Sequence, residues 1–288
     1  MMLIRSVLSR IPSEIWTLVA LLCLWQAIVS IFHVREILVP GVDVVLREIA
    51  DNPNFYFTQS MHTLGNTLAA FVISVVFGVG LAIAIVYSKF LEKTLYAALV
   101  ALNNVPKVAL APLFVIWLGT GNASKIAMGV LISIFAIVVD AVLGLRSLTP
   151  DMVDLGRSLR GSHLKMLIKL RLPNALPSIM AGTKVAISLA LVGAIVGEFV
   201  AAQNGLGFVI LSAQGMFRTD RVFAAILLLA VMGTVLFYFA EFLEAKLIPW
   251  HESHRHRSDP VTRRKPVRPP VNSASTDMSA PSVAVSKS

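Results

Sequence analysis

Residues 146–178 read RSLTPDMVDLGRSLRGSHLKMLIKLRLPNALPS and lie between two long apolar runs. The first part of this stretch predicts a short helix. Thr149 offers a hydroxyl cap, Pro150 fits the first helical turn, and Asp151 places an acid near the positive end of the helix dipole. Gly161 can end that helix, and Ser162 can cap a second one. The stretch is therefore expected to contain two short helices joined at a glycine.

The second part of the stretch predicts an amphipathic helix. Its apolar stripe and the basic residues outside that stripe are Leu164, Leu167 and Ile168 against Lys165, Lys169 and Arg171. Pro173 and Pro177 are expected to end this helix before the next apolar run. Two such helices on a polar loop form a surface suited to docking another protein. A helix lying in a membrane interface has the same spacing and stays an alternative.

The apolar runs on either side place the chain in a membrane. Of its 288 residues, 56% are hydrophobic and 14% are charged, whereas soluble domains have about 25% charged residues. A transmembrane helix needs about 20 apolar residues. Six runs approach that length: 15–32, 67–86, 95–118, 126–145, 179–201 and 222–240. The third is interrupted by Asn103, Asn104, Pro106 and Lys107. The sequence therefore predicts an all-α integral membrane protein with about six transmembrane helices.

The positive charges predict the orientation of these helices. With the N-terminus inside, eighteen of the 25 Lys and Arg residues lie on the inner side and five on the outer side, and short inner loops are the ones enriched in Lys and Arg. The first run is longer than a signal core and has no small-x-small cleavage site, so it is expected to stay as a helix. Both termini and the loop 146–178 are then cytoplasmic.

The sequence thus predicts three parts of the chain: an N-terminal segment 1–14, a transmembrane domain 15–250 and a tail 251–288. The tail is rich in Arg, Pro and Ser and cannot bury enough apolar surface to fold alone. Its three histidines, His251, His254 and His256, are better explained by a basic tail beside anionic lipid headgroups than by a metal site. The one cysteine, Cys23, cannot form an internal disulfide, and no metal site is expected.

No catalytic residues are expected in this chain. The nearest match to a phosphate-binding loop is Gly182-Thr183-Lys184, which has a threonine between Gly and Lys and follows no strand. Neither H-E-x-x-H nor G-x-S-x-G occurs. The chain is therefore not expected to bind ATP itself, and it is expected to hold no cofactor.

The loop 146–178 resembles the cytoplasmic loop of binding-protein-dependent ABC importer permeases, which carries E-A-A, three residues, G and then a stretch ending in L-P. Counted back from Leu172-Pro173, the E-A-A positions fall on Asp154, Leu155 and Gly156. The family glycine falls on Arg160, with Gly161 directly after it. The acid is thus kept as Asp, both alanines are replaced, and the glycine is displaced by one position.

Two further segments are similar to the nitrate/sulfonate/taurine-type branch of that family. They are VPKVALAPLFVIWLGTG at 105–121 and LVGAIVGEFVAAQNGLGFVI at 191–210. The resemblance covers roughly 39–250. It implies the type I importer fold, a pair of identical permease subunits, two cytoplasmic ATPase subunits that bind ATP and Mg²⁺, and an external solute-binding protein. It also implies a bacterial inner membrane, with membrane lipid but no nucleic acid as a partner.

The resemblance assigns the coupling to the ATPase to one helix near 154–162. The residues expected to take part are Asp154, Leu155, Gly156, Arg160, Gly161, Ser162, Leu172 and Pro173. Ionisable groups inside membrane spans are costly and are functional candidates by default. The candidates for the translocation pathway are Glu198, Asp140, Asn104 and Lys184. Four glycines are expected to permit close helix packing: Gly78, Gly80, Gly129 and Gly193.

Other functions fit the sequence less well. An ion-coupled secondary transporter would often show internal repeats, and none is seen between the two halves of the chain. A membrane scaffold or sensor would carry a folded output domain, and a membrane enzyme would carry a cluster of reactive side chains. The solute is expected to be a small anion of the sulfonate, taurine or nitrate type, with a heterocyclic vitamin precursor as the alternative. A heterodimer of permeases also stays possible.

Overall fold

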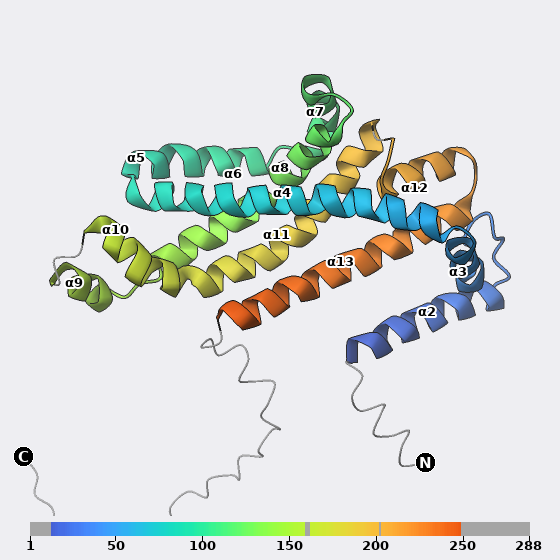
Figure 1. The fold of residues 1–288 in the computed structure, drawn as a ribbon, viewed down its shortest axis with the longest axis horizontal. Helices are drawn as coiled ribbons and strands as arrows, with labels where there is room; N and C mark the ends of the chain where they lie inside the picture. The colour runs from blue at the N-terminus through green and yellow to red at the C-terminus, as the bar shows by residue number, and fades with distance from the viewer. Residues whose placement is uncertain (1–12, 159–161, 202, 249–288) are drawn as a thin grey trace, which may run out of the picture. The chain divides into compact units, whose positions relative to one another are not determined.

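A computed structural model describes residues 13–158, 162–201 and 203–248, and all the regular elements in these ranges are helices (Figure 1). They belong to one compact unit of the chain. Three helices pack on one another at its centre: α4 (Pro53–Tyr87), α8 (Asn122–Arg146) and α11 (Leu172–Ala201). α13 (Thr219–Leu247) packs on α11, on α12 (Leu206–Gly215) and on α3 (Val42–Asp51), and α2 (Ser13–Ile31) contacts α3.

Four helices of the described chain are long and apolar enough to cross a membrane: Pro53–Tyr87, Asn122–Arg146, Leu164–Val200 and Thr219–Leu247. α2 has 19 residues, close to the length that a bilayer requires. α4 has 35 residues. At about 1.5 Å per residue it is longer than the roughly 30 Å hydrocarbon core. The predicted all-α membrane fold is confirmed.

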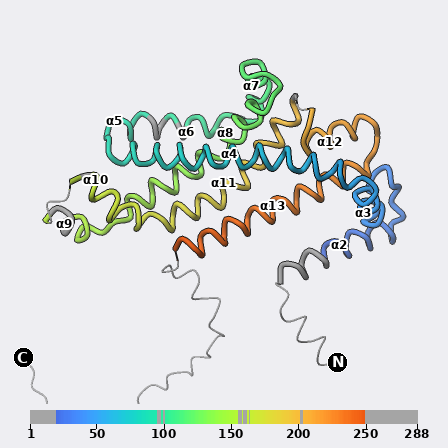
Figure 2. The backbone as a smooth tube through the Cα atoms, viewed as in Figure 1, coloured from blue at the N-terminus to red at the C-terminus, as the bar shows by residue number. Residues whose placement is uncertain are grey.

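The third predicted span, 95–118, is not one helix. α5 (Lys89–Leu91), a π-helical turn (Glu92–Tyr96) and α6 (Ala97–Asn103) come first, and a 3₁₀ turn (Lys107–Leu110) leads into α7 (Ala111–Leu118). The Asn104 and Val105 N–H groups donate to carbonyls three residues back, and Pro106 has no N–H to continue the helix. Figure 2 shows α7 turned away from the direction of α6.

The helix before α11 does not end at the prolines, so that expectation was wrong. α10 (His163–Met166) continues through a π-helical turn (Leu167–Arg171) into α11, and Pro177 lies inside α11. In the wide turn, the Leu172 N–H donates to the Leu167 carbonyl five residues back. Such a local π adjustment accommodates a proline that lacks its own N–H, here Pro173.

Small residues bring the central helices together. A Cβ on Gly193 would lie 2.6 Å from the Gly129 Cα, and one on Gly78 would lie 2.9 Å from a methyl of Ile137. Between α4 and α8, the Ser74 and Ser133 hydroxyls lie 2.7 Å apart. Close packing is thus confirmed for Gly78, Gly129 and Gly193. The prediction of close packing was wrong for Gly80, where a Cβ would meet nothing within 4 Å.

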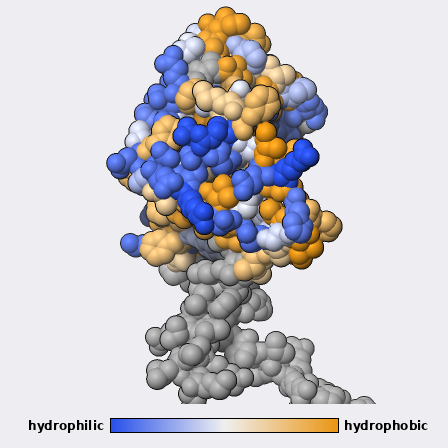
Figure 3. All heavy atoms as spheres, turned by 90° about the vertical axis from the view of Figure 1, so that its right-hand side faces the viewer, coloured by the Kyte–Doolittle hydropathy of each residue, from blue (hydrophilic) through white to orange (hydrophobic). Residues whose placement is uncertain are grey.

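The unit has two opposite ends (Figure 1). The α9 end holds α9 (Pro150–Ser158), α10, α5 and the last turn of α4, and the α12 end holds α3, α12 and the first turns of α4. Figure 3 views the α12 end, where hydrophilic residues gather over the middle. α4 reaches this end because it begins at Pro53, 14 residues before the predicted start of the span at Thr67.

Candidate functional site

α9 is the short helix that the loop sequence predicted. It begins at Pro150, directly after Thr149, and ends at Ser158. The Val153 N–H donates to the Thr149 carbonyl (3.2 Å), and the Ser158 hydroxyl donates to the Asp154 carbonyl (2.9 Å). Asp154 is exposed. α9 lies at the extremity of the unit (Figure 1).

The connection from α8 to α9 is fastened to the helices around it. The Ser147 hydroxyl donates to the Gly144 carbonyl and accepts from the Asn174 amide of α11, both at 2.8 Å. Arg146 forms an ion pair with Glu92 (2.8 Å) at the π-helical turn before α6. A Cβ on Gly144 would lie 2.9 Å from the Ala175 carbonyl oxygen. A displacement of the start of α9 would therefore act on both α8 and α11.

The other side of the loop leads into α10. The Ser162 hydroxyl accepts the Lys165 N–H (3.3 Å), so the predicted cap is present. Leu172 packs against the cluster that contains Leu145 and Ala175, and Pro173 is exposed. Arg160 and Gly161 lie outside the described residues. Leu155 and Gly156 are placed by their backbone in α9.

Glu198 of α11 is 1% exposed and lies against the start of α12. Its Oε2 accepts the Gly207 N–H (2.8 Å) and the Thr63 hydroxyl (3.1 Å). Thr63 Oγ1 accepts the Leu206 N–H (2.8 Å), and the Gln59 side-chain oxygen accepts the Gly205 N–H (2.6 Å). The first N–H groups of a helix have no partner within it, and here α4 and α11 provide three acceptors. The structure thus places this carboxylate in a buried capping arrangement.

Four buried polar residues in and around this arrangement were missed by sequence reasoning. Gln59 and Thr63 precede the predicted second span, and Lys125, which is 3% exposed, was assigned to an outer loop. Asn66, also buried, follows Thr63 on the same face of α4. The spacing 59, 63 and 66 is that of one helix face. This spacing, combined with a longer helix, was the available signal.

The other pathway candidates lie apart from Glu198 in different surroundings. Lys184 on α11 forms an ion pair with Glu244 on α13 at 2.6 Å, and the two side chains are 25% and 11% exposed. Asp140 on α8 is half-buried, and a Cβ on Gly182 of α11 would lie 2.8 Å from its carboxylate. Asn104 is exposed at the break between α6 and the 3₁₀ turn. The structure does not bring the four candidates into one cluster.

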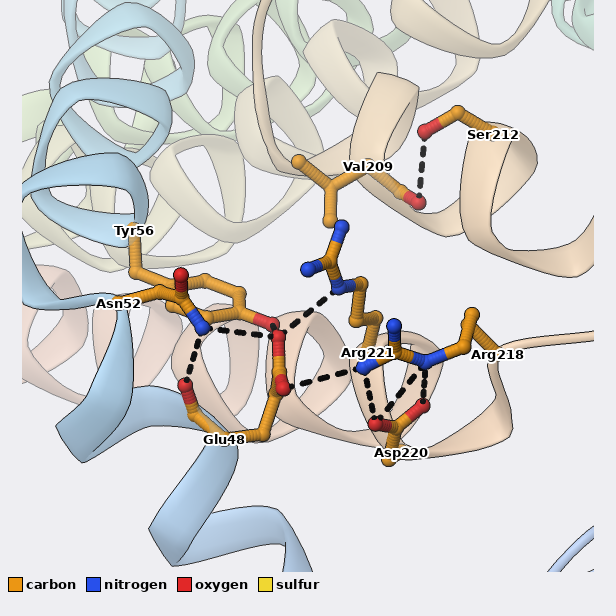
Figure 4. A network of polar contacts seen from close by, with 8 residues as sticks. All are labelled: Glu48, Asn52, Tyr56, Val209, Ser212, Arg218, Asp220 and Arg221. Carbon is orange, nitrogen blue, oxygen red and sulfur yellow. Dashed lines mark hydrogen bonds and ion pairs between the residues drawn. The ribbon is translucent and has the colours of Figure 1, made fainter. Parts of the chain in front are cut away.

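A polar network at the α12 end was also missed (Figure 4). The Glu48 carboxylate of α3 accepts from Arg221 Nε (2.9 Å) and from an Arg218 Nη (3.2 Å). Tyr56 of α4 donates its hydroxyl to Glu48 (3.4 Å), and Arg218 also pairs with Asp220 (2.7 Å). Because its members come from α3, α4 and the start of α13, the network holds these elements together.

Comparison with known proteins identifies the family. The model of the binding-protein-dependent transport system inner membrane component family matches residues 74–249. The chain belongs to this family. The permease is 31% identical to the formylaminopyrimidine transport permease protein ThiX of Halalkalibacterium halodurans, over 81% of this chain and 93% of ThiX. It is 29% identical to the taurine transport system permease protein TauC of Escherichia coli, over 86% of this chain and 93% of TauC.

A solved structure supports the same fold. The permease superposes on a chain of the MetNI methionine ABC transporter, crystallised in inward-facing conformations, with a TM-score of 0.57. The match covers 65% of the permease and 93% of that chain at 15% identity. The expected type I importer fold is thereby confirmed, and the relation to TauC supports the expected branch.

Proposed function

We propose that the permease carries a small solute across the membrane and that α9 is the helix through which partner ATPase subunits drive it. The observation that supports this proposal is the set of contacts that hold the start of α9 against α8 and α11. α9 lies at the extremity of the unit, and Ser147 at its base is hydrogen-bonded to Asn174 of α11. Arg146 is paired with Glu92 at the same place. Movement of α9 would thus reach the central helices α8 and α11 and change how they pack.

The proposal assigns a side of the membrane to each end. The α9 end faces the cytoplasm, with both chain termini, and the α12 end faces the external binding protein. ATP and Mg²⁺ bind to the partner subunits, and a second, identical permease completes the assembly in a bacterial inner membrane. The proposed coupling residues are Asp154, Leu155, Gly156, Arg160, Gly161, Ser162, Leu172 and Pro173. The tail 251–288, for which the sequence predicts a place beside anionic lipid headgroups, lies outside the described residues.

The proposed solute is a small anion of the sulfonate, taurine or nitrate type. The similarity to TauC, a taurine permease by name, supports this class. A heterocyclic vitamin precursor is the second candidate, because ThiX, named for formylaminopyrimidine transport, is about equally similar. Uptake of radiolabelled taurine and of a labelled aminopyrimidine by vesicles that contain the complete complex distinguishes the two.

A detergent pull-down tests the role of α9. The tagged permease is co-expressed with the ABC ATPase of the neighbouring gene, with residues 154–162 either intact or replaced by Gly and Ser. We expect the ATPase to co-purify only with the intact loop, because the replacement removes the helical surface. The matched control replaces exposed residues of α3 at the α12 end, Arg47→Ser with Asp51→Ser, and should retain the ATPase.

Either of two results would contradict the proposal. One is retention of the ATPase by the Gly/Ser variant, which would show that α9 is not the docking element. The other is failure of the intact permease to retain any ATPase, which would favour ion-coupled transport. The thermal unfolding midpoint of each variant, measured in the same detergent, separates loss of docking from loss of folding.

A further inference from the structure

The break in the third crossing places polar groups inside an apolar segment. α6 ends at Asn103, and the 3₁₀ turn begins at Lys107. Asn103 and Asn104 are exposed on the surface of the unit, and so is much of Leu102 (51%) and Val105 (38%). The helical segments on both sides are apolar, so the break lies within the depth of the membrane rather than at its edge.

Such a surface is not stable against lipid. Within the hydrocarbon core, non-helical backbone is tolerated only where it is buried in protein or lines a water-filled cavity, because lipid offers no hydrogen bonds. Placing asparagine side chains or an ammonium group against lipid also costs free energy. The described chain leaves this surface open. In the assembled transporter it must therefore face another protein or water.

Lys107 has unused hydrogen-bonding capacity at this place. Its Nζ donates to the Asn103 side-chain oxygen at 2.7 Å, and it lies 5.8 Å from the centroid of the Phe135 ring on α8. An ammonium group has three donors, and the attraction to a ring face holds the cation without neutralising it. Among the described residues, no carboxylate lies within ion-pair distance of Lys107.

The other cations of the central helices are placed differently. Lys184 is neutralised by Glu244 at 2.6 Å, and Lys125 is only 3% exposed. Asp140 on α8 has the opposite sign, and it is half-buried against Gly182 of α11. Lys107 is half-buried, so it differs from Lys125 in being more exposed and from Lys184 in having no carboxylate partner within the described chain.

We propose that Asn103, Asn104, Lys107 and Phe135 form a solute-contacting site, here called the break site, on a water-filled pathway, and that Lys107 makes it selective for an anionic group. The spare ammonium donors bind a carboxylate or sulfonate, and Asn104 offers a further amide donor. This inference rests on the proposed transport function and adds the residue that would select the charge of the solute.

The test uses the single cysteine of the chain. Replacement by Cys23→Ser gives a cysteine-free permease, into which Asn104→Cys is introduced. Permeabilised membranes containing this full-length permease are treated with an anionic reagent, sulfonatoethyl methanethiosulfonate, and a cationic one, trimethylammonioethyl methanethiosulfonate. The rates of thiol modification are compared with those of Val235→Cys, an exposed apolar position on α13 (60%).

We expect Asn104→Cys to react with both reagents and Val235→Cys with neither. A charge close to the thiol speeds the anionic reagent and slows the cationic one, so adding Lys107→Gln should lower the ratio of the two rates about tenfold. Lys107→Arg keeps the charge and should keep the ratio. The rescue by arginine separates the effect of charge from any change in local structure.

Three outcomes would overturn the inference. If Asn104→Cys is unreactive like Val235→Cys, the break is covered by protein or lipid. If the ratio of rates is unchanged in Lys107→Gln, Lys107 does not set the local charge selectivity. If the cationic reagent is favoured, the pathway is dominated by carboxylates such as Asp140. None of these results bears on the ATPase pull-down, so the proposed importer function would stand or fall separately.

Discussion

At the residue scale, the buried polar groups explain why the start of α12 has its shape. Gly205 has φ of +108°, a conformation that glycine adopts without strain. A side chain there would also occupy the space of the Glu198 carboxylate. Sequence analysis could single out Glu198 as an ionisable residue in a span. It could not find the capping arrangement, because three of the groups involved are the backbone N–H donors of residues 205, 206 and 207, which no residue letter reports.

Thr63 is the residue on which this arrangement depends most. Its hydroxyl donates to Glu198 and accepts the Leu206 N–H. Thr63→Val keeps the shape but leaves both groups buried without that partner. We expect a loss of about 1–3 kcal/mol in the free energy of unfolding, seen as a lower thermal unfolding midpoint of the purified permease in detergent.

Thr58→Val is the matched control for Thr63→Val on the same helix. Thr58 is exposed, and its hydroxyl donates to the Asn54 carbonyl within α4. Its replacement should change the midpoint little. Equal midpoints for Thr63→Val and Thr58→Val would mean that the cap on α12 contributes nothing to stability.

At the scale of elements, hydropathy located the spans but did not show which of them are single helices. The predicted fourth span, 126–145, agrees with α8 (Asn122–Arg146) to within four residues at each end. In the third span, the polar residues at 103, 104 and 106 were visible in the sequence, but the separation into α6, a 3₁₀ turn and α7 was not. The prediction that the helix before α11 ends at the prolines was wrong for a different reason. Proline predicts a missing hydrogen bond, and the chain can meet that loss by widening one turn as well as by ending the helix.

The Lys184–Glu244 ion pair joins α11 to α13 and gives a test at this scale. Lys184→Met leaves the Glu244 carboxylate, 11% exposed, without its partner. Breaking a buried pair costs more than removing it entirely. We expect Lys184→Met to lower the unfolding free energy by about 2 kcal/mol, and Lys184→Met with Glu244→Leu to recover most of that loss, both measured by thermal unfolding.

Lys246→Met on the exposed side of α13 is the control for the loss of a lysine and should be close to wild type. If the double variant is less stable than Lys184→Met and than Glu244→Leu alone, the two side chains contribute to stability independently. The pair would then not be what fastens α13 to α11.

At the scale of the whole molecule, the sequence predicts the sidedness through charge, and the structure provides positions at which to test it. In the Cys23→Ser background, Arg47→Cys marks α3 at the α12 end and Ser158→Cys marks the end of α9. Both positions are exposed. We expect a membrane-impermeant maleimide to label Arg47→Cys in spheroplasts and to label Ser158→Cys only after lysis, because Lys and Arg concentrate on the cytoplasmic side. Labelling in the reverse order would invert the proposed topology.

The type of fold could be predicted from composition and run length, because lipid permits few alternatives to helices. The course of the proposed pathway could not be predicted, because it depends on which surfaces the proposed second subunit would leave open. Lys107 illustrates the difference. Its identity and position are plain in the sequence, but its half-buried place beside Phe135 follows from a break whose geometry only the fold defines.

The break in the third crossing also has a consequence for biogenesis. The helical pieces on its two sides, residues 89–103 and 107–118, are each shorter than the roughly 20 residues that span a bilayer. A lysine near the centre of a segment costs about 2.5–3.5 kcal/mol at the translocon. This segment is therefore a weak signal for insertion by itself. It depends on the strongly apolar α8, which follows within a few residues, so the two would enter the membrane together as one helical hairpin.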